Sequence, residues 1–202
     1  MSALLEAEHL TKAFIQRGKE PFKAVNDVSF TLNKGETLGI VGESGSGKST
    51  IVKMITHLTE ITDGTLKFHG KDITKVSQSQ LREMYGHIQM VFQNPAGSFD
   101  PRRTLGDGVG ECLRNRGMKK TETEKRVAEL LEQCGLDSEY AKRYPHEVSG
   151  GQCQRAAIAR ALAVNPRVLI CDEATSALDV TIQKQIMELL QELKEKQGLS
   201  FI

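Results

Sequence analysis

Hydrophobic and polar residues alternate along the first third of the chain, a pattern typical of β-strands. Val28, Phe30 and Leu32 occupy every second position, and Asn-Lys-Gly then marks a turn. The segment TLGIVG, residues 37–42, is almost continuously apolar and predicts a buried strand. The chain is therefore expected to begin with β structure.

Two further strands are predicted before the pattern changes. Leu66 and Phe68 alternate with polar residues after an Asp-Gly turn, and HIQMVFQ, residues 87–93, is a mostly apolar run that ends before Asn-Pro. From about residue 96 to residue 120 the chain is rich in glycine, arginine and lysine and has few regular periods. We place no helix or strand in that segment.

Helical patterns follow. Thr121 and Glu124 have the spacing of a capping box at the start of a helix that Gly135 can end. The apolar face of this helix carries Val127, Leu130, Leu131 and Cys134. A second helix is predicted from about residue 151 to residue 164, where Asn-Pro stops it.

A buried strand and a long helix come next. RVLICDEA, residues 167–174, is apolar until Asp172, and Gly198 is the predicted stop of the following helix. One face of that helix carries Ile182, Ile186, Leu189, Leu190 and Leu193. LSFI, residues 199–202, has the pattern of a strand that is beginning. The order of elements predicts a parallel α/β core with an inserted helical block at about residues 96–162.

Composition is that of a soluble globular chain with an aliphatic core, since 39% of residues are hydrophobic, 5% are aromatic and tryptophan is absent. A net charge of +1 argues against a broad nucleic-acid-binding surface, which is usually clearly basic. No apolar run approaches the roughly 18 residues of a membrane span, and the N-terminus lacks a signal-peptide pattern. Reduced thiols of a cytosolic protein are favoured over a disulfide framework or metal site by the absence of CxxC pairing among Cys112, Cys134, Cys153 and Cys171.

The sequence GESGSGKS, residues 42–49, fits GxxxxGK[ST] without a mismatch and lies between an apolar strand and a helix. Glycines let backbone N–H groups converge on phosphate oxygens, and the helix start adds the positive end of its dipole. Lys48 can then reach the β- and γ-phosphates, and the Ser49 hydroxyl can ligate magnesium. The alternative is a plain strand-to-helix turn, which motif and context together disfavour.

Two acidic residues and one amide complete this chemistry. Asp172 ends a predicted parallel strand, where ligands of such folds bind, and could hold magnesium through water. Glu173 is placed to polarise an attacking water, although acidic residues also enrich ordinary helix starts. Gln93 closes another strand and could ligate magnesium or position water. Taken alone, Gln93 is an ordinary loop glutamine.

A second glycine-rich helix start lies at residues 149–152, Ser-Gly-Gly-Gln. Ser149 is a good N-cap residue, and the free amides that follow it can bind an anion. An ordinary helix cap with a tight turn is the alternative.

Taken together and in this order, GESGSGKST, VFQNP, VSGGQ, LICDE and SALD resemble the nucleotide-binding subunit of ABC transporters, over essentially the whole chain. SGGQ is the specific motif, because most other P-loop families lack it. The residues that flank these motifs are similar to those of the ATPases of bacterial peptide and nickel importers. This resemblance implies a P-loop NTPase fold with a RecA-like parallel core, an N-terminal antiparallel β subdomain and an α-helical subdomain. It assigns residues 1–95 and 163–202 to the ATP-binding core and residues 96–162 to the helical subdomain.

The resemblance also implies a role for each motif. Gln93 senses magnesium and the transmembrane partner, Asp172 is the magnesium-side acid, Glu173 is the general base, and Asp179 belongs to a loop that crosses a dimer interface. The implied nucleotide-binding residues are Phe14, Gly42, Glu43, Ser44, Gly45, Ser46, Gly47, Lys48, Ser49, Thr50, Ser149, Gly150, Gly151, Gln152 and Asp179. The implied catalytic residues are Glu173, Gln93 and Lys48, and the implied magnesium ligands are Ser49, Gln93 and Asp172.

Phe14 is the aromatic residue that we expect to stack on adenine, with Phe22 second; a core phenylalanine is the alternative for Phe14. Val148 stands where the family more often has leucine. The family's switch histidine would follow the strand that begins with LSFI, which predicts a chain truncated before the end of its core. Such a chain is expected to bind ATP and to hydrolyse it poorly.

The resemblance implies an importer subunit at the cytoplasmic face of the membrane, with ATP and Mg²⁺ as cofactors. Its expected partners are a second ATP-binding subunit, identical or related, two transmembrane permeases and, indirectly, an extracellular solute-binding protein, without nucleic acid. The cargo implied by the resemblance is a peptide, nickel or a metal chelate, which the ATPase itself does not touch. The alternatives are a nucleotide-dependent scaffold and an ABC-type ATPase acting on nucleic acid, for which the best feature is the cluster Arg114, Arg116, Lys119 and Lys120.

Overall fold

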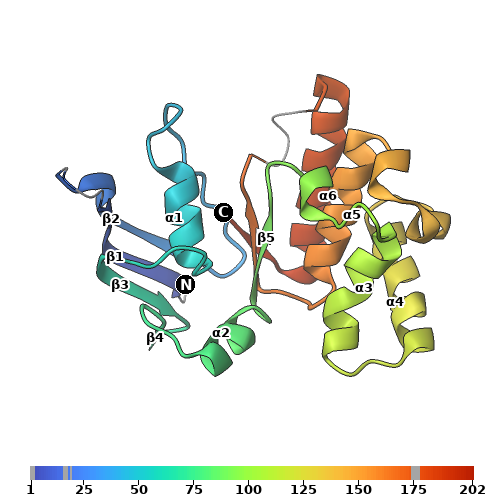
Figure 1. The fold of residues 1–202 in the computed structure, drawn as a ribbon, viewed down its shortest axis with the longest axis horizontal. Coiled ribbons are helices and arrows are strands. Elements are labelled where there is room, and N and C mark those ends of the chain that lie inside the picture. The colour runs from blue at the N-terminus through green and yellow to red at the C-terminus, as the bar shows by residue number, and fades with distance from the viewer. Residues whose placement is uncertain (1–2, 16–17, 19, 174–177) are drawn as a thin grey trace.

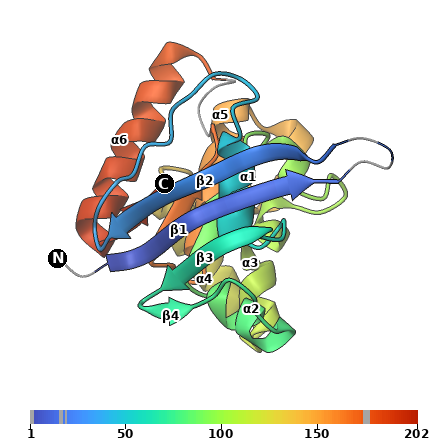
Figure 2. The same cartoon turned by 90° about the vertical axis from the view of Figure 1, so that its left-hand side faces the viewer.

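A computed structural model describes residues 3–15, 18, 20–173 and 178–202, and its strands form two sheets (Figure 1). The first sheet is antiparallel, in the order β2-β1-β3-β4, and faces the viewer in Figure 2. Its strands are β1 (Ala3–Phe14), β2 (Phe22–Asn33), β3 (Asp63–Phe68) and β4 (Lys71–Asp72). The second is parallel and consists of β5 (Ile88–Val91), β6 (Val168–Cys171) and β7 (Ser200–Phe201).

Helices cover both sides of the parallel sheet. One helix lies between the two sheets, and a helical layer lies on the far side (Figure 1). The α-helices are α1 (Lys48–Ile55), α2 (Gln78–Met84), α3 (Leu105–Asn115), α4 (Lys120–Gln133), α5 (Gly150–Leu162) and α6 (Val180–Gln197). Short 3₁₀ turns are η1 (Ala96–Ser98), η2 (Ser138–Lys142) and η3 (Pro145–Glu147).

The parallel sheet separates two hydrophobic cores, because the side chains of its central strand alternate. Val168 and Ile170 of β6 pack into the core shared with α1 and the antiparallel sheet. Leu169, between them, packs into the core formed with α3 to α6. All three are fully buried, which confirms the strand predicted from the apolar run VLIC.

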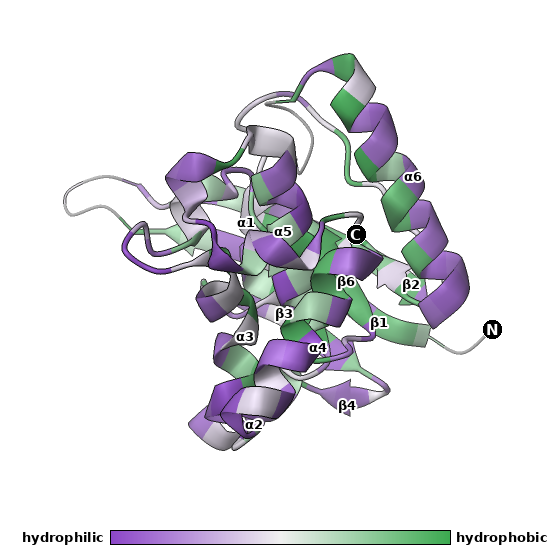
Figure 3. Cartoon of the chain, turned by 90° about the vertical axis from the view of Figure 1, so that its right-hand side faces the viewer, coloured by the Kyte–Doolittle hydropathy of each residue, from purple (hydrophilic) through white to green (hydrophobic). Residues whose placement is uncertain are grey.

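The long C-terminal helix is also confirmed. α6 ends at Gly198, whose φ of 65° is the left-handed conformation that favours glycine. Hydrophobic and hydrophilic positions alternate around its surface in Figure 3. Its buried residues are Ile186, Leu189, Leu190 and Leu193, all on the predicted face.

The predicted buried strand at residues 37–42 is wrong. Thr37 forms an isolated parallel bridge with Phe201, and Leu38 N–H donates to the Phe201 carbonyl at 2.9 Å. Beyond this point no described strand pairs with the segment, and Val41 is 95% exposed. A cavity of about 370 Å³ lies between residues 37–40, the end of β6 and α6, so the apolar segment lacks the neighbour that a strand requires.

The predicted capping box at Thr121 is wrong as well, because α4 begins at Lys120 and Lys119 is its N-cap. The Thr123 hydroxyl and N–H both bond to the Lys119 carbonyl, at 3.0 and 2.9 Å, which places the first turn ahead of Thr121. The apolar face is confirmed, since Val127, Leu130, Leu131 and Cys134 are all buried. The second predicted helix is α5, which runs over residues 150–162.

Two helices were missed. α2 carries a sequence signal, because Ser77 and Gln80 form a capping box at its start. α3 lacked a helical pattern because it contains three glycines, which serve close packing here. A β-carbon at Gly108 would lie 2.5 Å from a ring atom of Phe99, and one at Gly110 would lie 2.7 Å from the Thr123 side chain.

Gly108→Ala should therefore lower the free energy of unfolding by about 1–3 kcal/mol, because the added methyl overpacks the Phe99 contact. Gly39→Ala is the matched control, since a β-carbon at Gly39 meets nothing within 4 Å. It should leave stability unchanged or raise it by about 0.4–1 kcal/mol. Urea unfolding of the two variants measures both values. Equal stability of the two would contradict the packing role of Gly108.

Candidate functional site

The loop at residues 42–47 turns sharply into α1. Gly45 has a φ of 82°, and Gly47, the N-cap of α1, has a φ of 95°. A β-carbon at Gly47 would overlap the Ala24 carbonyl oxygen. Residues 42–46 are exposed, and the Ser46 N–H donates to the Glu43 carbonyl at 3.2 Å. The structure confirms the predicted glycine-rich turn into a helix, and its role in phosphate binding stays a prediction.

Lys48 folds back over this loop. Its Nζ donates to the carbonyls of Gly42 and Glu43, each at 2.8 Å. The Thr50 N–H donates to the Gly47 carbonyl at 3.0 Å, which begins the helical ladder. The ammonium group is thus held above the loop, where the motif requires a cation for phosphate.

Ser49 and Asp172 lie side by side although 123 positions separate them. The Ser49 hydroxyl donates to Asp172 Oδ1 at 3.1 Å. Asp172 follows β6 directly, and its N–H donates to the Val91 carbonyl of β5 at 3.1 Å. The carboxylate is therefore fixed at the carboxyl edge of the parallel sheet, facing the start of α1, as predicted.

Gln93 and Glu173 form a second pair at the same edge. Gln93 Nε2 donates to Glu173 Oε2 at 2.6 Å. Glu173 has a φ of 48°, a left-handed conformation that costs a non-glycine residue about 1–3 kcal/mol and is concentrated at functional sites. The amide holds the carboxylate of the predicted general base in one orientation.

Two cavities open at these pairs, and Asp172 lines both. The cavity of about 370 Å³ is also lined by Lys48 and Glu173. The larger cavity, about 750 Å³, is also lined by Gln93 and by Phe92, which is 38% exposed. The predicted phosphate-side and water-side residues thus share one region of the surface.

The second glycine-rich motif caps α5. Ser149 Oγ accepts from the Gln152 N–H at 3.3 Å, and Gln152 Oε1 accepts from the Ser149 N–H at 2.8 Å. This capping box confirms the Ser149 N-cap. A β-carbon at Gly151 would lie 2.8 Å from Ile182, so the second glycine lets α5 approach α6. Gly150 is less crowded, since its nearest neighbour would be Leu178 at 3.5 Å.

Residues 149–152 line neither cavity described above. α5 packs in the core on one side of the parallel sheet, whereas α1 packs in the core on the other side (Figure 1). The structure therefore brings Lys48, Ser49, Asp172, Glu173 and Gln93 together and leaves the Ser149 motif out of that group.

Asp179 and Phe14 stand at the margins of the predicted site. Asp179 is the N-cap of α6, and its Oδ1 accepts from the Ile182 N–H at 3.0 Å. Ser176 and Ala177 of the same motif lie outside the described residues. Phe14 is 41% exposed and pairs in register with Phe22, which is 63% exposed. The alternative of a core phenylalanine is wrong, and adenine stacking stays a prediction.

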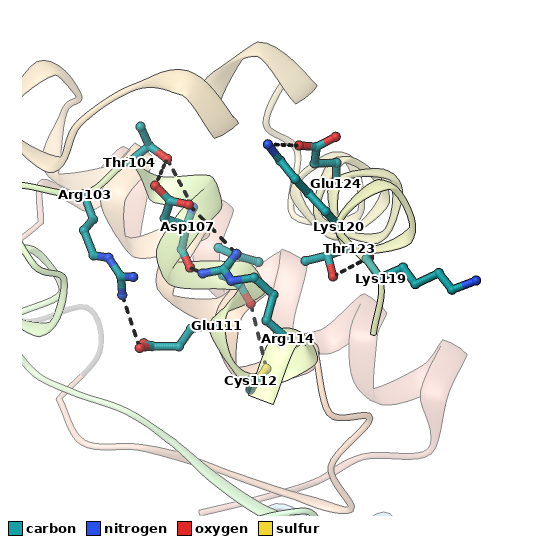
Figure 4. A network of polar contacts seen from close by, with 11 residues as sticks. Arg103, Thr104, Asp107, Glu111, Cys112, Arg114, Lys119, Lys120, Thr123 and Glu124 are labelled. Atoms are coloured by element: carbon teal, nitrogen blue, oxygen red, sulfur yellow. Dashed lines mark hydrogen bonds and ion pairs between the residues drawn. The ribbon is translucent and has the colours of Figure 1, made fainter. Parts of the chain in front are cut away.

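The basic cluster near the α3–α4 turn is partly compensated (Figure 4). Arg114 donates to the Asp107 carbonyl at 2.6 Å and lies 3.9 Å from the Asp107 carboxylate. Lys120 lies 3.9 Å from Glu124. These contacts favour a solvated helix surface over a phosphate-binding groove.

Sequence reasoning missed Tyr140, whose hydroxyl accepts from Gln152 Nε2 at 2.7 Å and so holds the glutamine of the second motif. No sequence signal marks this contact, because Tyr140 lies in the separate turn η2. The four cysteines are free thiols. Burial raises the pKa of Cys171, the residue before Asp172, to about 12, so this thiol stays protonated.

Fold and site together define a phosphate-binding α/β protein of the P-loop type. The sequence profile of the ABC transporter family matches residues 25–176. This chain belongs to the ABC transporter family.

Relatives and solved structures agree with this assignment. The chain is 49% identical to the oligopeptide transport ATP-binding protein OppF of Bacillus subtilis, over 98% of this chain and 66% of that protein. It is 41% identical to the di/tripeptide transport ATP-binding protein DppF of Pseudomonas aeruginosa, over 100% of this chain and 64% of that protein. It therefore spans about two thirds of the length of these relatives.

The fold matches a dimeric post-hydrolysis structure of the ATP-binding cassette MJ0796 bound to ADP and Pi. The TM-score is 0.88 with 33% sequence identity, over 98% of this chain and 85% of that chain. The predicted fold class, an ABC ATPase cassette with an antiparallel β subdomain, a parallel sheet and helical elements, is confirmed.

Proposed function

We propose that this chain is the ATP-binding and ATP-hydrolysing subunit of a bacterial ABC importer for peptides or for nickel or metal chelates. The observation that carries the proposal is the meeting of Lys48, the Ser49–Asp172 pair and the Gln93–Glu173 pair at one sheet edge. Peptide cargo is supported by the names of the relatives.

The residues present fit a magnesium ion. Magnesium prefers oxygen ligands, keeps several waters and is bound by one or two carboxylates with substrate phosphates. The Ser49 hydroxyl and the Asp172 carboxylate supply such oxygens 3.1 Å apart, and the Gln93 amide oxygen is the third proposed ligand. When bound, the ion would neutralise charge on the phosphates.

Hydrolysis then needs a general base, a group that orients the attacking water, and groups that stabilise the charge on the phosphate oxygens. The chain supplies all three. Glu173 accepts a proton from the attacking water, which raises the nucleophilicity of that water. Gln93, at 2.6 Å from Glu173, orients the carboxylate and the water. Lys48 and the open amides at the start of α1 stabilise the negative charge that develops on the phosphate oxygens.

We propose that two ATP-binding subunits, identical or related, close around two ATP molecules. The start of α5 can bind an anion through its amides, yet residues 149–152 line neither of the two cavities at the site. In the proposed dimer each Ser149 motif meets the ATP held by the partner chain, and Asp179 lies at the interface. Each chain then contributes half of two sites.

Among the described residues, no helix is both long and apolar enough to cross a bilayer. We propose that two permeases hold the subunit at the cytoplasmic face, and that an extracellular solute-binding protein acts through them without touching it. The cavity of about 750 Å³ beside the exposed Phe92 and Gln93 is the proposed permease contact.

We also propose that residues 1–95 and 163–202 form the ATP-binding core and residues 96–162 the helical subdomain. Packing supports this division in part. One hydrophobic cluster joins α1 to the antiparallel sheet, whereas the cluster of α3 to α5 also includes residues of α6.

Lys48→Ala tests the nucleotide site. In the full-length protein its affinity for ATP should fall about 100-fold, because charge-assisted contacts of this kind contribute about 1.5–3 kcal/mol each. Isothermal titration with ATP and magnesium measures the change. Lys125→Ala, an exposed lysine of α4 outside both cavities at the site, is the control and should bind ATP normally. Equal affinity of the Lys48 variant and the unaltered protein would refute the proposed site.

A further inference from the structure

Arg160, in the last turn of α5, makes contacts that the proposed catalytic groups do not explain. One guanidinium nitrogen donates to the Ser98 carbonyl at 2.6 Å, and the other donates to the Ser98 hydroxyl at 2.8 Å. The guanidinium carbon lies 4.4 Å from the centroid of the Phe99 ring, which is cation–π geometry. A single side chain thus holds residues 98 and 99 from two sides.

The segment that Arg160 holds is tightly wound and follows Gln93 directly. The Ser98 hydroxyl donates to the Pro95 carbonyl at 2.7 Å, and the Gly97 N–H donates to Asn94 Oδ1 at 3.0 Å. Phe99 is 5% exposed and packs on α3. Residues 94–99 therefore form one compact unit.

α5 carries the Ser149 motif at its other end, about 16 Å away along the helix axis. At the far end of the 94–99 unit, Gln93 donates to Glu173 at 2.6 Å. Arg160 provides a side-chain link between these two ends, because it lies on α5 and donates to Ser98 of the unit that begins beside Gln93.

We propose that Arg160 is a positioning residue that links the Ser149 helix to the Gln93–Glu173 pair through residues 94–99. A displacement of α5 at Ser149 is then delivered to the carboxylate that activates water. This inference rests on the proposed ATPase function. The chemical requirement at position 160 is a planar fork that meets two acceptors and stacks on a ring.

Lysine cannot meet that requirement. It keeps the charge but offers a single ammonium in place of the fork and loses the stacked face. Burial also lowers the pKa of Arg160, because desolvation disfavours the charged form, so the guanidinium needs all its acceptors. Arg160→Lys is therefore a mild change with a specific defect.

Arg155 provides a matched control on the same helix. Its guanidinium donates to the Cys134 carbonyl at 2.9 Å and to Gln185 Oε1 at 3.2 Å. These contacts tie α5 to α4 and α6 and leave residues 94–99 untouched. Arg155→Lys thus removes a similar pair of contacts without breaking the proposed link.

The first arm of the test is hydrogen exchange of the full-length protein without ATP. Arg160→Lys should speed exchange of the amides of residues 97–99 about tenfold, because their 3₁₀ turn loses its clamp. Arg155→Lys should leave these amides unchanged. Equal protection in both variants would overturn the link without reference to catalysis.

The second arm is a double-mutant cycle on ATP turnover with Gln93→Ala. Arg160→Lys alone should lower kcat about tenfold with KM for ATP within about twofold. In the Gln93→Ala background it should have no further effect, whereas any effect of Arg155→Lys should multiply with that of Gln93→Ala. Multiplicative effects of Arg160→Lys and Gln93→Ala would overturn a role through Gln93.

The two arms separate this inference from the proposed function. If the unaltered protein failed to turn over ATP in its assembled complex, the ATPase proposal would fail, and with it the catalytic role of the link. The exchange arm would still decide whether Arg160 joins the two segments. Normal melting of Arg160→Lys by circular dichroism excludes simple misfolding as the cause of a defect.

Discussion

Replacing Glu173 with glutamine should lower ATP turnover about a thousandfold while leaving ATP affinity within a few fold. A positioned general base contributes about 10²–10⁴ in rate, and glutamine cannot accept the proton. Glutamine has nearly the same size as glutamate, so it can still accept from Gln93, whose Nε2 lies 2.6 Å from Glu173 Oε2 in the unaltered protein. The substitution also leaves the Lys48 loop untouched. Phosphate release from the full-length protein at saturating ATP measures the effect.

The same variant should retain ATP and accumulate as a dimer, because closure no longer ends in hydrolysis. Size-exclusion chromatography with and without ATP shows this directly. Glu60→Gln removes an exposed carboxylate outside the two cavities at the site and is the control, with normal turnover and no trapped dimer. Turnover of the Glu173 variant within tenfold of the unaltered protein would exclude Glu173 as the base.

Ser149→Arg should abolish ATP-driven dimer closure and leave ATP binding at Lys48 intact. Ser149 caps α5 with Gln152 and lines neither of the two cavities at the site, so a bulky cation there does not reach the chain's own site. In the proposed dimer it would fill the space of the partner's phosphate. Light scattering in the Glu173→Gln background measures closure, and calorimetry measures binding.

Loss of a helix cap costs about 1 kcal/mol by itself, so the control must lose the same cap elsewhere. Ser77 caps α2 with Gln80 in the same reciprocal arrangement. Ser77→Arg should close normally with ATP. If both variants failed to close, the effect of Ser149→Arg would be structural, and the proposed role of the Ser149 motif at the partner's ATP would be contradicted.

Sequence patterns correctly predicted the elements whose own apolar residues determine which side is buried. The apolar run of β6 and the heptad-like face of α6 are buried as expected, because each supplies its own packing surface. The pattern at residues 37–42 failed, because an apolar segment becomes a strand only beside a partner strand. α3 was not predicted, because glycine is a poor helix former. Two of its glycines are needed for close packing against Phe99 and Thr123, which a local sequence pattern does not show.

The candidate site divides in the same way. Motif spacing identified Lys48, Ser49 and the Ser149 cap, since loop-to-helix geometry is local. The hydrogen bond between Ser49 and Asp172 joins residues 123 positions apart, so no local spacing predicts it. It forms because β6 lies in the parallel sheet beside β5 and ends directly before Asp172. No sequence motif marks the contact of Tyr140 with Gln152 or that of Arg160 with Ser98. These two contacts could be found only from the structure.

The central claim, that each ATP site is shared between two chains, is tested most directly by mixing two defective variants. One chain carries Lys48→Ala and the other carries Ser149→Arg, and both also carry Glu173→Gln. The two proteins are mixed, and the ATP retained by the dimer is measured after gel filtration. Neither variant alone should form a closed dimer. A mixed dimer keeps one intact site, formed by Lys48 of one chain and Ser149 of the other.

In an equal mixture only a Lys48→Ala chain paired with a Ser149→Arg chain can close, and each such dimer has one of its two sites intact. The mixture should therefore retain up to about half of the ATP held by the Glu173→Gln protein. Retention no greater than that of the two variants measured separately would show that Lys48 and Ser149 do not act on the same ATP from different chains, and would contradict the shared-site mechanism.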